Sequence, residues 1–549
     1  MKIPPSRSRG LIEWGALTIL ADMRYFSAVV LRVPLRSYQV EPVHAILDSI
    51  LHKRGLEFLL VFPRQSGKNE AIAQLLTYLL NLYQRAGASI IYGAVGDAIG
   101  LGIERLEQRL DNSWNQAQWR VATKPRRRRL GKAEVIFLSS HPAASTRGQT
   151  ASHLLIIDET QDQIASHIES VFTPMRAASN ATAVYIGTVK TSSDYLWQKK
   201  LELEGEERKD GRQRVFFVLP DRVCAENPLY GEFLEGQVTK HGRNHPIVAS
   251  EYFLEPIDAS GGMFPPRRQA LMRGDHARQV GPQPGRLYVA TVDVAGEDEA
   301  ATDPVAALAR PGRDYTVGTV FEVVYPPPGV YAPGPSYRAV DVFVDHGSKH
   351  FEDVPGRPAL IHRLHAWLDH WQVAHTIADA SGVGQGLVAW FKDALGETRV
   401  TGFNFSGNGK KAHLGSAFLS LVETGRFKYW TDEAAECSSS PTAAPAPGDS
   451  ANGIGALSDA AWFWAQVRAC GYEIPPDGRF DVDLRWGVPT SHKTDTPQGL
   501  RLTHDDRLLS AALVAELDRL LRTGDIVLGT AESATIPGTD PLADLGEVY

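Results

Sequence analysis

The sequence predicts an α/β protein of two domains. Three observations lead to this prediction. The apolar run 58–62 leads through a polar Gly-Lys loop into a helical pattern, the apolar run 154–157 ends on two carboxylates, and the runs 287–293 and 375–379 each end on an aspartate. Continuous apolar runs are typical of buried parallel strands, and an open parallel sheet places its ligand crevice at the carboxyl ends of its strands. We therefore expect one site in each domain.

The composition sets the outer limits. A chain of 549 residues has room for two or three domains, and a hydrophobic fraction of 43% with 22% charged residues is ordinary for globular proteins. The net charge of −7 argues against a uniformly basic nucleic-acid coat but leaves room for a local basic groove. Cys224, Cys437 and Cys470 are far apart, so neither a disulfide framework nor a zinc site is expected. The N-terminus lacks the apolar core of a signal peptide, and no run is apolar enough to span a membrane.

The loop after the first apolar run has the order strand, phosphate loop, helix. Unpaired backbone N–H groups at a helix N-terminus attract phosphate, and Lys68 would reach the outer phosphates of a nucleotide. The match is partial, since Phe62 replaces the first glycine and Asn69 the final Ser or Thr. An ordinary strand-to-helix turn is the alternative. The candidate nucleotide-binding residues here are Pro63, Arg64, Gln65, Ser66, Gly67, Lys68 and Asn69.

Asp158 and Glu159 follow the buried run 154–157. Asp158 would hold Mg²⁺, directly or through water, and Glu159 would orient and deprotonate the attacking water. Phosphoryl transfer needs these parts together, namely a phosphate cradle, a metal and a positioned nucleophile. The alternative is a strand that ends in a charged turn. The phosphate loop upstream favours the nucleotide interpretation.

Further residues fit around these two motifs. Tyr38 can stack on an adenine and Gln39 can hydrogen-bond its edge, although a helix N-terminus with a packed tyrosine has the same pattern. Arg147, before the acidic strand, can reach a neighbouring subunit's γ-phosphate as an arginine finger, and Arg64 can supply the same charge in cis. Thr188, at the end of the buried run 183–187, can sense the γ-phosphate. Solvated arginines and a plain strand end are the alternatives.

In this order, the elements resemble the ATPase domain of the large terminase subunit of tailed bacteriophages. The resemblance implies a P-loop domain of the RecA/ASCE class and assigns Tyr38 and Gln39 to the adenine motif. It likewise implies the Walker A loop at 63–69, the Walker B strand at 154–159 and a coupling motif at Gly187-Thr188. Asn69 departs from the family, where Thr or Ser is usual. An amide oxygen can ligate Mg²⁺ or hold its water, so this departure concerns the turnover rate more than nucleotide binding.

In the second half, Asp293 and Asp379 end two strands, and Asp505 and Asp506 open a helix behind His504. Three carboxylates from such elements can hold two divalent metals that activate water for phosphodiester hydrolysis, and oxygen ligands favour Mg²⁺ or Mn²⁺. Strand-end and capping aspartates are common, so each alone is weak. Together, in a strand–strand–strand–helix–strand order, they resemble the RNase H/RuvC-like nuclease domain of terminases. This implies metal ligands at Asp293, Asp379 and Asp506, with Asp505 next in rank.

Two basic segments can contact DNA. The run 124–129, Lys-Pro-Arg-Arg-Arg-Arg, precedes a predicted strand, and Lys410 and Lys411 open an amphipathic helix. A solvated hairpin and a solvated helix start are the alternatives.

We predict an ATPase domain with an N-terminal lead-in over 1–257, a Gly/Pro-rich linker over 258–285 and a nuclease domain over 286–522. The low-complexity stretch 433–455 is predicted as a mobile insertion, and 523–549 as a flexible tail.

The resemblance implies a motor that hydrolyses ATP to drive double-stranded DNA into a procapsid and cuts concatemeric DNA. It also implies Mg²⁺ (or Mn²⁺) at both sites, a portal protein and a small terminase subunit as partners, and a homo-oligomeric ring on the portal. The expected place is the host cytoplasm during assembly rather than the mature virion. One alternative is a helicase or repair translocase with an accessory nuclease, which needs a second RecA-like domain. The other is a non-hydrolysing DNA-binding scaffold, supported by Asn69.

Overall fold

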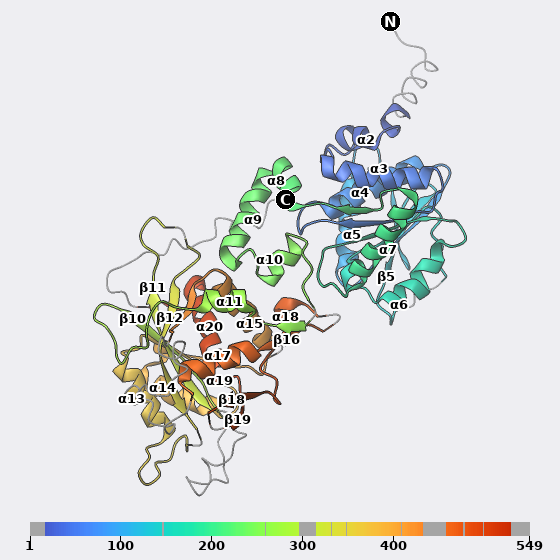
Figure 1. The fold of residues 1–549 in the computed structure, drawn as a ribbon. Coiled ribbons are helices and arrows are strands. Elements are labelled where there is room, and N and C mark those ends of the chain that lie inside the picture. The colour runs from blue at the N-terminus through green and yellow to red at the C-terminus, as the bar shows by residue number, and fades with distance from the viewer. Residues whose placement is uncertain are drawn as a thin grey trace, which may run out of the picture. The chain divides into compact units, whose positions relative to one another are not determined.

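The computed structural model describes residues 17–144, 146, 148–258, 260–295, 315–330, 332–346, 348–407, 409–431, 457–475, 478–497 and 499–528. The chain forms two compact units, drawn in Figure 1 and described one at a time. The first comprises Met1–Gly236 with Pro246–Ala259, and the second Gln237–His245 with Ser260–Tyr549.

The first unit is built on an eight-stranded sheet of order β3-β4-β5-β2-β6-β7-β1-β8. The strands from β5 to β8 in this order pair in parallel, and the β3–β4 hairpin is antiparallel. One strand, β7, separates β1, which leads into the phosphate loop, from β6, which ends on the two acids. This insertion confirms the predicted RecA/ASCE-like class. The strands are β1 (Glu57–Val61), β2 (Ala88–Ala94), β3 (Arg120–Thr123), β4 (Arg126–Leu130), β5 (Ala133–Ser139), β6 (Leu154–Ile157), β7 (Thr182–Gly187) and β8 (Val215–Phe217).

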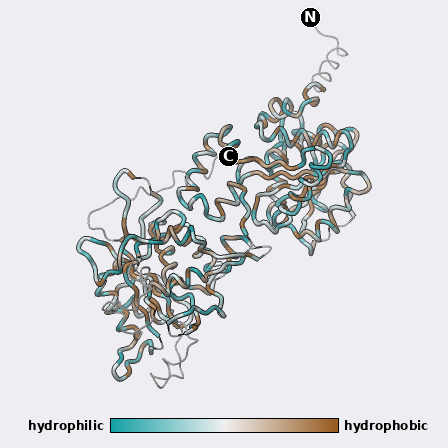
Figure 2. The backbone as a smooth tube through the Cα atoms, viewed as in Figure 1, coloured by the Kyte–Doolittle hydropathy of each residue, from teal (hydrophilic) through white to brown (hydrophobic). Residues whose placement is uncertain are grey.

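Helices enclose this sheet, and its strands carry the apolar colour in Figure 2. All four residues of β6 are buried, as are all residues of α4 from 71 to 81, and α4 packs against β4 and β5. The helices are α2 (Met23–Val29), α3 (Ser37–Leu51), α4 (Lys68–Leu82), α5 (Ala98–Leu110), α6 (Ala165–His167), α7 (Tyr195–Asp210), α8 (Pro220–Glu226), α10 (Pro246–Glu251) and α9 (Pro228–His241), of which the residues from Gln237 belong to the second unit.

The second unit is built on a six-stranded sheet of order β14-β13-β10-β11-β12-β15. In chain order, β10, β11 and β12 form an antiparallel meander, and a helical crossover then places β13 parallel to β10. This is the RNase H-like arrangement that the sequence predicted. The main elements are β10 (Leu287–Asp293), β11 (Thr316–Val324), β12 (Ser336–Asp345), α13 (Leu360–His370), β13 (His375–Asp379), α14 (Gly384–Leu395), β14 (Val400–Phe403) and β15 (Phe427–Tyr429).

The remaining elements of this unit pack around the sheet. Helix α19 contacts β10 and β11, which brings the acids at its N-terminus to the sheet. These elements are α15 (Lys410–Glu423), α17 (Asp459–Ala469), β16 (Gly471–Glu473), α18 (Phe480–Asp483), β17 (Arg485–Gly487), β18 (Lys493–Thr496), β19 (Gly499–Leu502), α19 (Asp506–Ala512) and α20 (Val514–Thr523).

The stretch 258–285 differs from the loosely packed linker that its Gly/Pro content predicts. It contains β9 (Ser260–Gly262), which pairs with β16, and α11 (Pro266–Met272), which packs on α15 and β15. Met263, Phe264 and Met272 are buried. A few apolar side chains thus anchor a segment whose average composition suggests a linker.

Two predicted segments lie outside the described residues: the insertion 433–455, and residues 529–549 of the predicted tail 523–549. Among the helices that the structure describes, none has the length and apolar character required to cross a membrane.

Candidate functional site

The loop between β1 and α4 has a backbone shape that depends on two left-handed residues. Gln65 has φ +60° and Gly67 has φ +90°, and α4 begins immediately afterwards at Lys68. A Cβ atom on Gly67 would lie 2.7 Å from Nε2 of Gln39, so the position requires glycine. The loop therefore meets the positive end of a long helix, where a phosphate is favoured.

The carbonyl groups of this loop are occupied by side chains. Tyr38 OH donates to Ser66 O at 2.8 Å, and Gln39 Nε2 donates to Gly67 O at 2.8 Å. Ser66 Oγ donates to Pro63 O at 2.6 Å, and Tyr230 OH donates to Arg64 O at 3.1 Å. These bonds fix the loop in one conformation before any ligand arrives, which lowers the entropic cost of binding.

The structure gives Tyr38 and Gln39 another place than the predicted adenine contact. The Tyr38 ring is fully buried and packs edge-on against Phe62, so neither face is open to a stacking base. Gln39 is also buried, and its amide is engaged by the loop and by the backbone N–H of Arg36. Both residues support the phosphate loop from behind. The sequence pattern alone could not separate support of the loop from contact with adenine, since both roles need a tyrosine upstream of the loop.

Lys68 lies beside the two acids at the end of β6. Its Nζ is 3.5 Å from Oε1 of Glu159 and 3.9 Å from Oδ1 of Asp158. Residues that are 91 positions apart thus meet at one sheet edge, as the motifs predicted. Glu159 has φ +47°, a strained conformation for a glutamate that is found at functional sites.

The two acids differ in their protonation tendencies. Burial raises the pKa of Asp158 above its ordinary value, against the attraction of Lys68. Burial also acts to raise the pKa of Glu159, but the charge of Lys68 and a hydrogen bond from Gln161 outweigh it and hold that pKa below the ordinary value. Glu159 is therefore more readily ionised than Asp158.

A hydrogen-bond relay leads away from Glu159. Gln161 Nε2 donates to Oε2 of Glu159 at 2.6 Å, and Oε1 of Gln161 accepts from the backbone N–H of Thr188 at 3.2 Å. The predicted sensor Thr188 therefore connects to Glu159 through one side chain. The sequence pattern did not predict a role for Gln161, whose signal is a polar residue two positions after the acid pair. Nor did it predict Tyr92, whose OH donates to Oδ2 of Asp158 at 2.5 Å.

Of the two candidate arginines for the γ-phosphate, the structure describes only Arg64. Arg64 is held by the carboxylate of Glu251 through two hydrogen bonds of 2.8 Å and 2.7 Å. Its charge still contributes to lowering the pKa of Glu159. Arg147 lies outside the described residues.

Asn69 fits a magnesium ion at this site in one respect. Its Oδ1 is buried and has no hydrogen-bond partner among the described residues. A buried amide oxygen without a partner is costly, and a cation or its water would satisfy it. Asn69 and Asp158 are the residues that would hold the ion.

The acids of the second unit meet in one pocket of about 270 Å³. Asp293 and Asp379 end two paired parallel strands, in which Val292 lies opposite Ala378, so the carboxylates emerge side by side. Asp506 and Asp505 line the same pocket from the N-terminus of α19. The predicted convergence of strand and helix acids is therefore observed.

The electrostatics show how closely these acids are coupled. Burial raises the pKa of Asp293 well above its ordinary value, and the charges of Asp506, Asp379 and Asp505 raise it further. Burial also raises the pKa of Asp379, although the Ser381 backbone N–H donates to its Oδ1 at 2.8 Å. Such a cluster is unfavourable as it stands, and divalent cations would relieve it.

A lysine also faces this pocket. Lys411 Nζ lies 3.5 Å from Oδ2 of Asp505 and 5.5 Å from the centroid of the Trp486 ring, whereas Lys410 is exposed and outside the pocket lining. His504 lies near the Tyr315 ring, at 6.3 Å between centroids. Within the described parts of the chain, no three acidic, histidine or cysteine side chains form a ready-made metal cage. The fit to a metal therefore rests on the oxygen-only donor set and on the mutual repulsion of the acids.

Fold and sites together define a class: a P-loop unit of the ASCE type, joined in one chain to a unit with an RNase H-like fold.

Large terminases of several phages match this structure. The large terminase of one thermophilic bacteriophage, in its crystal form 2, has 10% sequence identity and a TM-score of 0.42, with 88% of this chain and 99% of that chain covered. That of bacteriophage HK97 has 13% identity and a TM-score of 0.35, covering 91% and 99%. The large terminase nuclease of the thermophilic phage G20c, with bound magnesium, has 16% identity and a TM-score of 0.28, covering 46% and 96%. No protein-family model matches the sequence, and neither does any curated protein.

Proposed function

We propose that this chain is the large subunit of a phage terminase, which hydrolyses ATP to move double-stranded DNA into a procapsid and cuts concatemeric DNA. The observation that carries the proposal is the presence of two assembled sites in one chain. Lys68 lies against Glu159 in the first unit, and Asp293, Asp379 and Asp506 share a pocket in the second.

In the ATPase site, Lys68 would exchange its contact with Glu159 for the outer phosphates of ATP. Glu159, released from the lysine charge that lowers its pKa, would then be free to take a proton from the attacking water. Gln161 orients this carboxylate and connects it to Thr188, so loss of the γ-phosphate can be transmitted to the end of β7. When bound beside Asn69 and Asp158, Mg²⁺ supplies charge neutralisation for the phosphates.

In the nuclease site, Asp293, Asp379 and Asp506 would hold Mg²⁺ or Mn²⁺, with Asp505 as an additional carboxylate. Such ions supply water activation and stabilisation of the leaving oxygen. Lys411 carries the positive charge at this pocket and would hold the DNA phosphate against the acids.

The proposal includes partners of the same assembly. These are double-stranded DNA, a portal protein, a small terminase subunit and further copies of this chain in a ring, in the host cytoplasm during assembly. The alternative is a non-hydrolysing DNA-binding scaffold. Motion along DNA distinguishes the motor from this scaffold, because only the motor moves.

Translocation is measured directly by ATP-driven displacement of a triplex-forming strand from duplex DNA. We expect displacement that requires ATP and is lost in Lys68→Ala, while Asp379→Ala leaves it intact and loses cleavage of plasmid DNA in Mn²⁺. ATP turnover without displacement would contradict the motor, and cleavage that persists in both Asp379→Ala and Asp506→Ala would contradict the nuclease assignment.

A further inference from the structure

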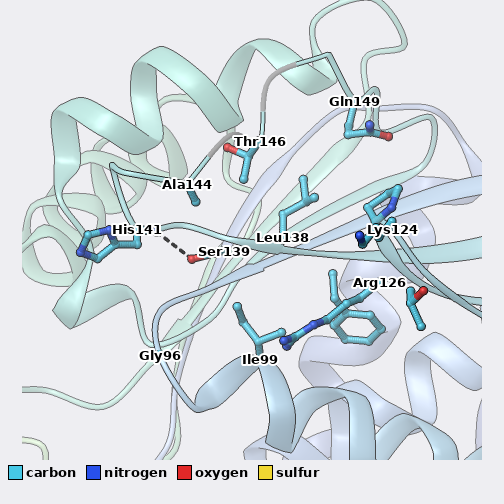
Figure 3. A pocket seen from close by; sticks show the side chains of 13 residues that line it. Gly96, Ile99, Lys124, Arg126, Leu138, Ser139, His141, Ala144, Thr146 and Gln149 are labelled. Carbon is cyan, nitrogen blue, oxygen red and sulfur yellow. Dashed lines mark hydrogen bonds between the residues drawn. The ribbon is translucent and has the colours of Figure 1, made fainter.

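A second, larger pocket lies in the first unit, apart from the phosphate loop. It has a volume of about 760 Å³ and is formed between the β3–β4 hairpin, the end of β5 and the start of α5 (Figure 3). This volume is within the range of ligand sites. Lys124, Arg126 and His141 line it, and no acidic side chain does. The lining therefore has the chemistry of an anion site.

The charges at this pocket follow from the alternation of side chains along β4. Arg127 and Arg129 lie on one face, and both are paired with Glu134, at 3.3 Å and 2.7 Å. On the opposite face, Arg128 is buried and pairs with Glu107 of α5 at 2.6 Å. The last three arginines of the basic run thus form ion pairs with two acids of the same unit. The solvated or DNA-facing run that the sequence predicted is mainly an internal ion-pair network.

Two residues of the run remain without such a partner. Arg126 shares the face of Arg128 but lies nearer the first turn of α5, which has no acidic residue. Lys124 lies in the hairpin turn. Neither makes an ion pair with any residue that the structure describes, and both are exposed. The pocket is therefore the place where the positive charge of the run is available.

Two further donors border the pocket. His141 Nδ1 accepts from the backbone N–H of Ala143 at 3.2 Å, so in the neutral ring the hydrogen is on Nε2, which can donate to an anion. Thr146 is 7% exposed, and its Oγ1 has no hydrogen-bond partner within the described residues. A buried hydroxyl without a partner is unfavourable unless a ligand or water completes it. Figure 3 shows His141 and Thr146 on the side of the pocket opposite Lys124.

We propose that this pocket is a second phosphate-binding site, distinct from the nucleotide loop, that takes a backbone phosphate of duplex DNA. The inference rests on the proposed function for the identity of the DNA. The chemistry recognised is the phosphate itself, since the one aromatic lining residue, Phe137, is 3% exposed and offers no face to a base. Recognition by charge without base contacts is the mode by which proteins hold DNA independently of sequence.

The first test compares salt dependence of duplex binding by the full chain in EDTA, where DNA is not cut. Each lost phosphate contact lowers the slope of log K against log salt by about 0.9. Lys124→Ala with Arg126→Ala removes the one phosphate contact of the pocket, and is therefore expected to lower the magnitude of the slope by about 0.9 and to weaken binding roughly tenfold at moderate salt. Arg127→Ala with Arg129→Ala removes the same number of charges, but from ion pairs with Glu134 outside the pocket, and is expected to leave the slope unchanged. Equal effects of both changes would overturn the proposal.

The second test places the ligand directly, by acylation of lysines followed by mass spectrometry. Duplex DNA is expected to protect Lys124 in the wild-type chain and to leave Lys132, an exposed lysine at the other end of β4, reactive. Inorganic phosphate and ATP are run as separate arms. If inorganic phosphate or ATP protects Lys124 and DNA does not, the bound phosphate does not come from DNA. If none of the three protects Lys124, the pocket is not a phosphate-binding site. If the wild-type chain binds no duplex at any salt, the proposed function fails as well; if it binds and Lys124 stays reactive, only this inference fails.

Discussion

Tyr38→Phe separates support of the phosphate loop from contact with adenine. The substitution keeps the ring and removes the hydroxyl that donates to Ser66 O at 2.8 Å and accepts from Arg36 Nη1 at 2.9 Å. Ser66 is 1% exposed, so its carbonyl loses a partner that water does not easily replace. An unsatisfied buried group of this kind costs about 1–3 kcal/mol.

If the nucleotide must supply this free energy to order the loop on binding, nucleotide affinity falls roughly 5- to 150-fold. The assay is titration with a fluorescent ATP analogue in Mg²⁺, with thermal unfolding to show that the unit remains folded. Tyr83→Phe is the matched control, because that half-buried ring packs on His153 and its hydroxyl has no hydrogen-bond partner among the described residues. Stacking on adenine needs only the ring. Unchanged affinity in Tyr38→Phe would therefore refute the loop-support role.

Asn69→Thr is expected to raise kcat for ATP severalfold, because a hydroxyl is the usual ligand at this position; a lower kcat would show that the amide is required. Asp293→Asn is expected to stabilise the metal-free second unit, because it removes a carboxylate whose pKa is raised by burial and by like charges, and to abolish the Mn²⁺-dependent rise in Tm. A retained Mn²⁺ effect would exclude Asp293 as a ligand. Lys411→Ala is expected to raise KM for DNA cleavage at least about tenfold with Mn²⁺ binding retained, and Lys410→Ala to change neither; equal effects would deny Lys411 a place at the phosphate. Burial lowers the pKa of His245 to about 3, so the unfolded chain binds a proton that the native chain does not. The free energy of unfolding therefore falls as pH drops below 6.5, by about 2 kcal/mol at pH 5. Urea unfolding of His245→Gln is expected to show a weaker loss of stability at acid pH. An equally steep loss in this variant would assign the pH dependence to other groups.

The positions of the main site residues followed from sequence because their signals are local. The four apolar residues of β6 can only be a buried strand, and a carboxylate at its end must lie at the sheet edge that also carries Lys68. The same reasoning placed Asp293 and Asp379 together, since adjacent parallel strands end at one edge.

Other features depend on contacts that no local pattern encodes. Tyr38 is buried because α3 packs behind the loop, and the burial excludes the stacking that its sequence position suggested. The run 124–129 has uniform charge in sequence, but Glu107 and Glu134 form ion pairs with its last three arginines and leave Lys124 and Arg126 without such a partner among the described residues. Only the three-dimensional placement of acids distinguishes these residues.

The central claim is that two independent pockets, one for nucleotide and one for phosphodiester hydrolysis, exist in one chain. It is tested most directly by measuring ATP turnover and Mn²⁺-dependent plasmid cleavage on the same preparations of wild type, Lys68→Ala and Asp293→Asn. We expect Lys68→Ala to lose turnover and keep cleavage, and Asp293→Asn to do the reverse. Loss of both activities in either variant, or of neither in both, would contradict the assignment.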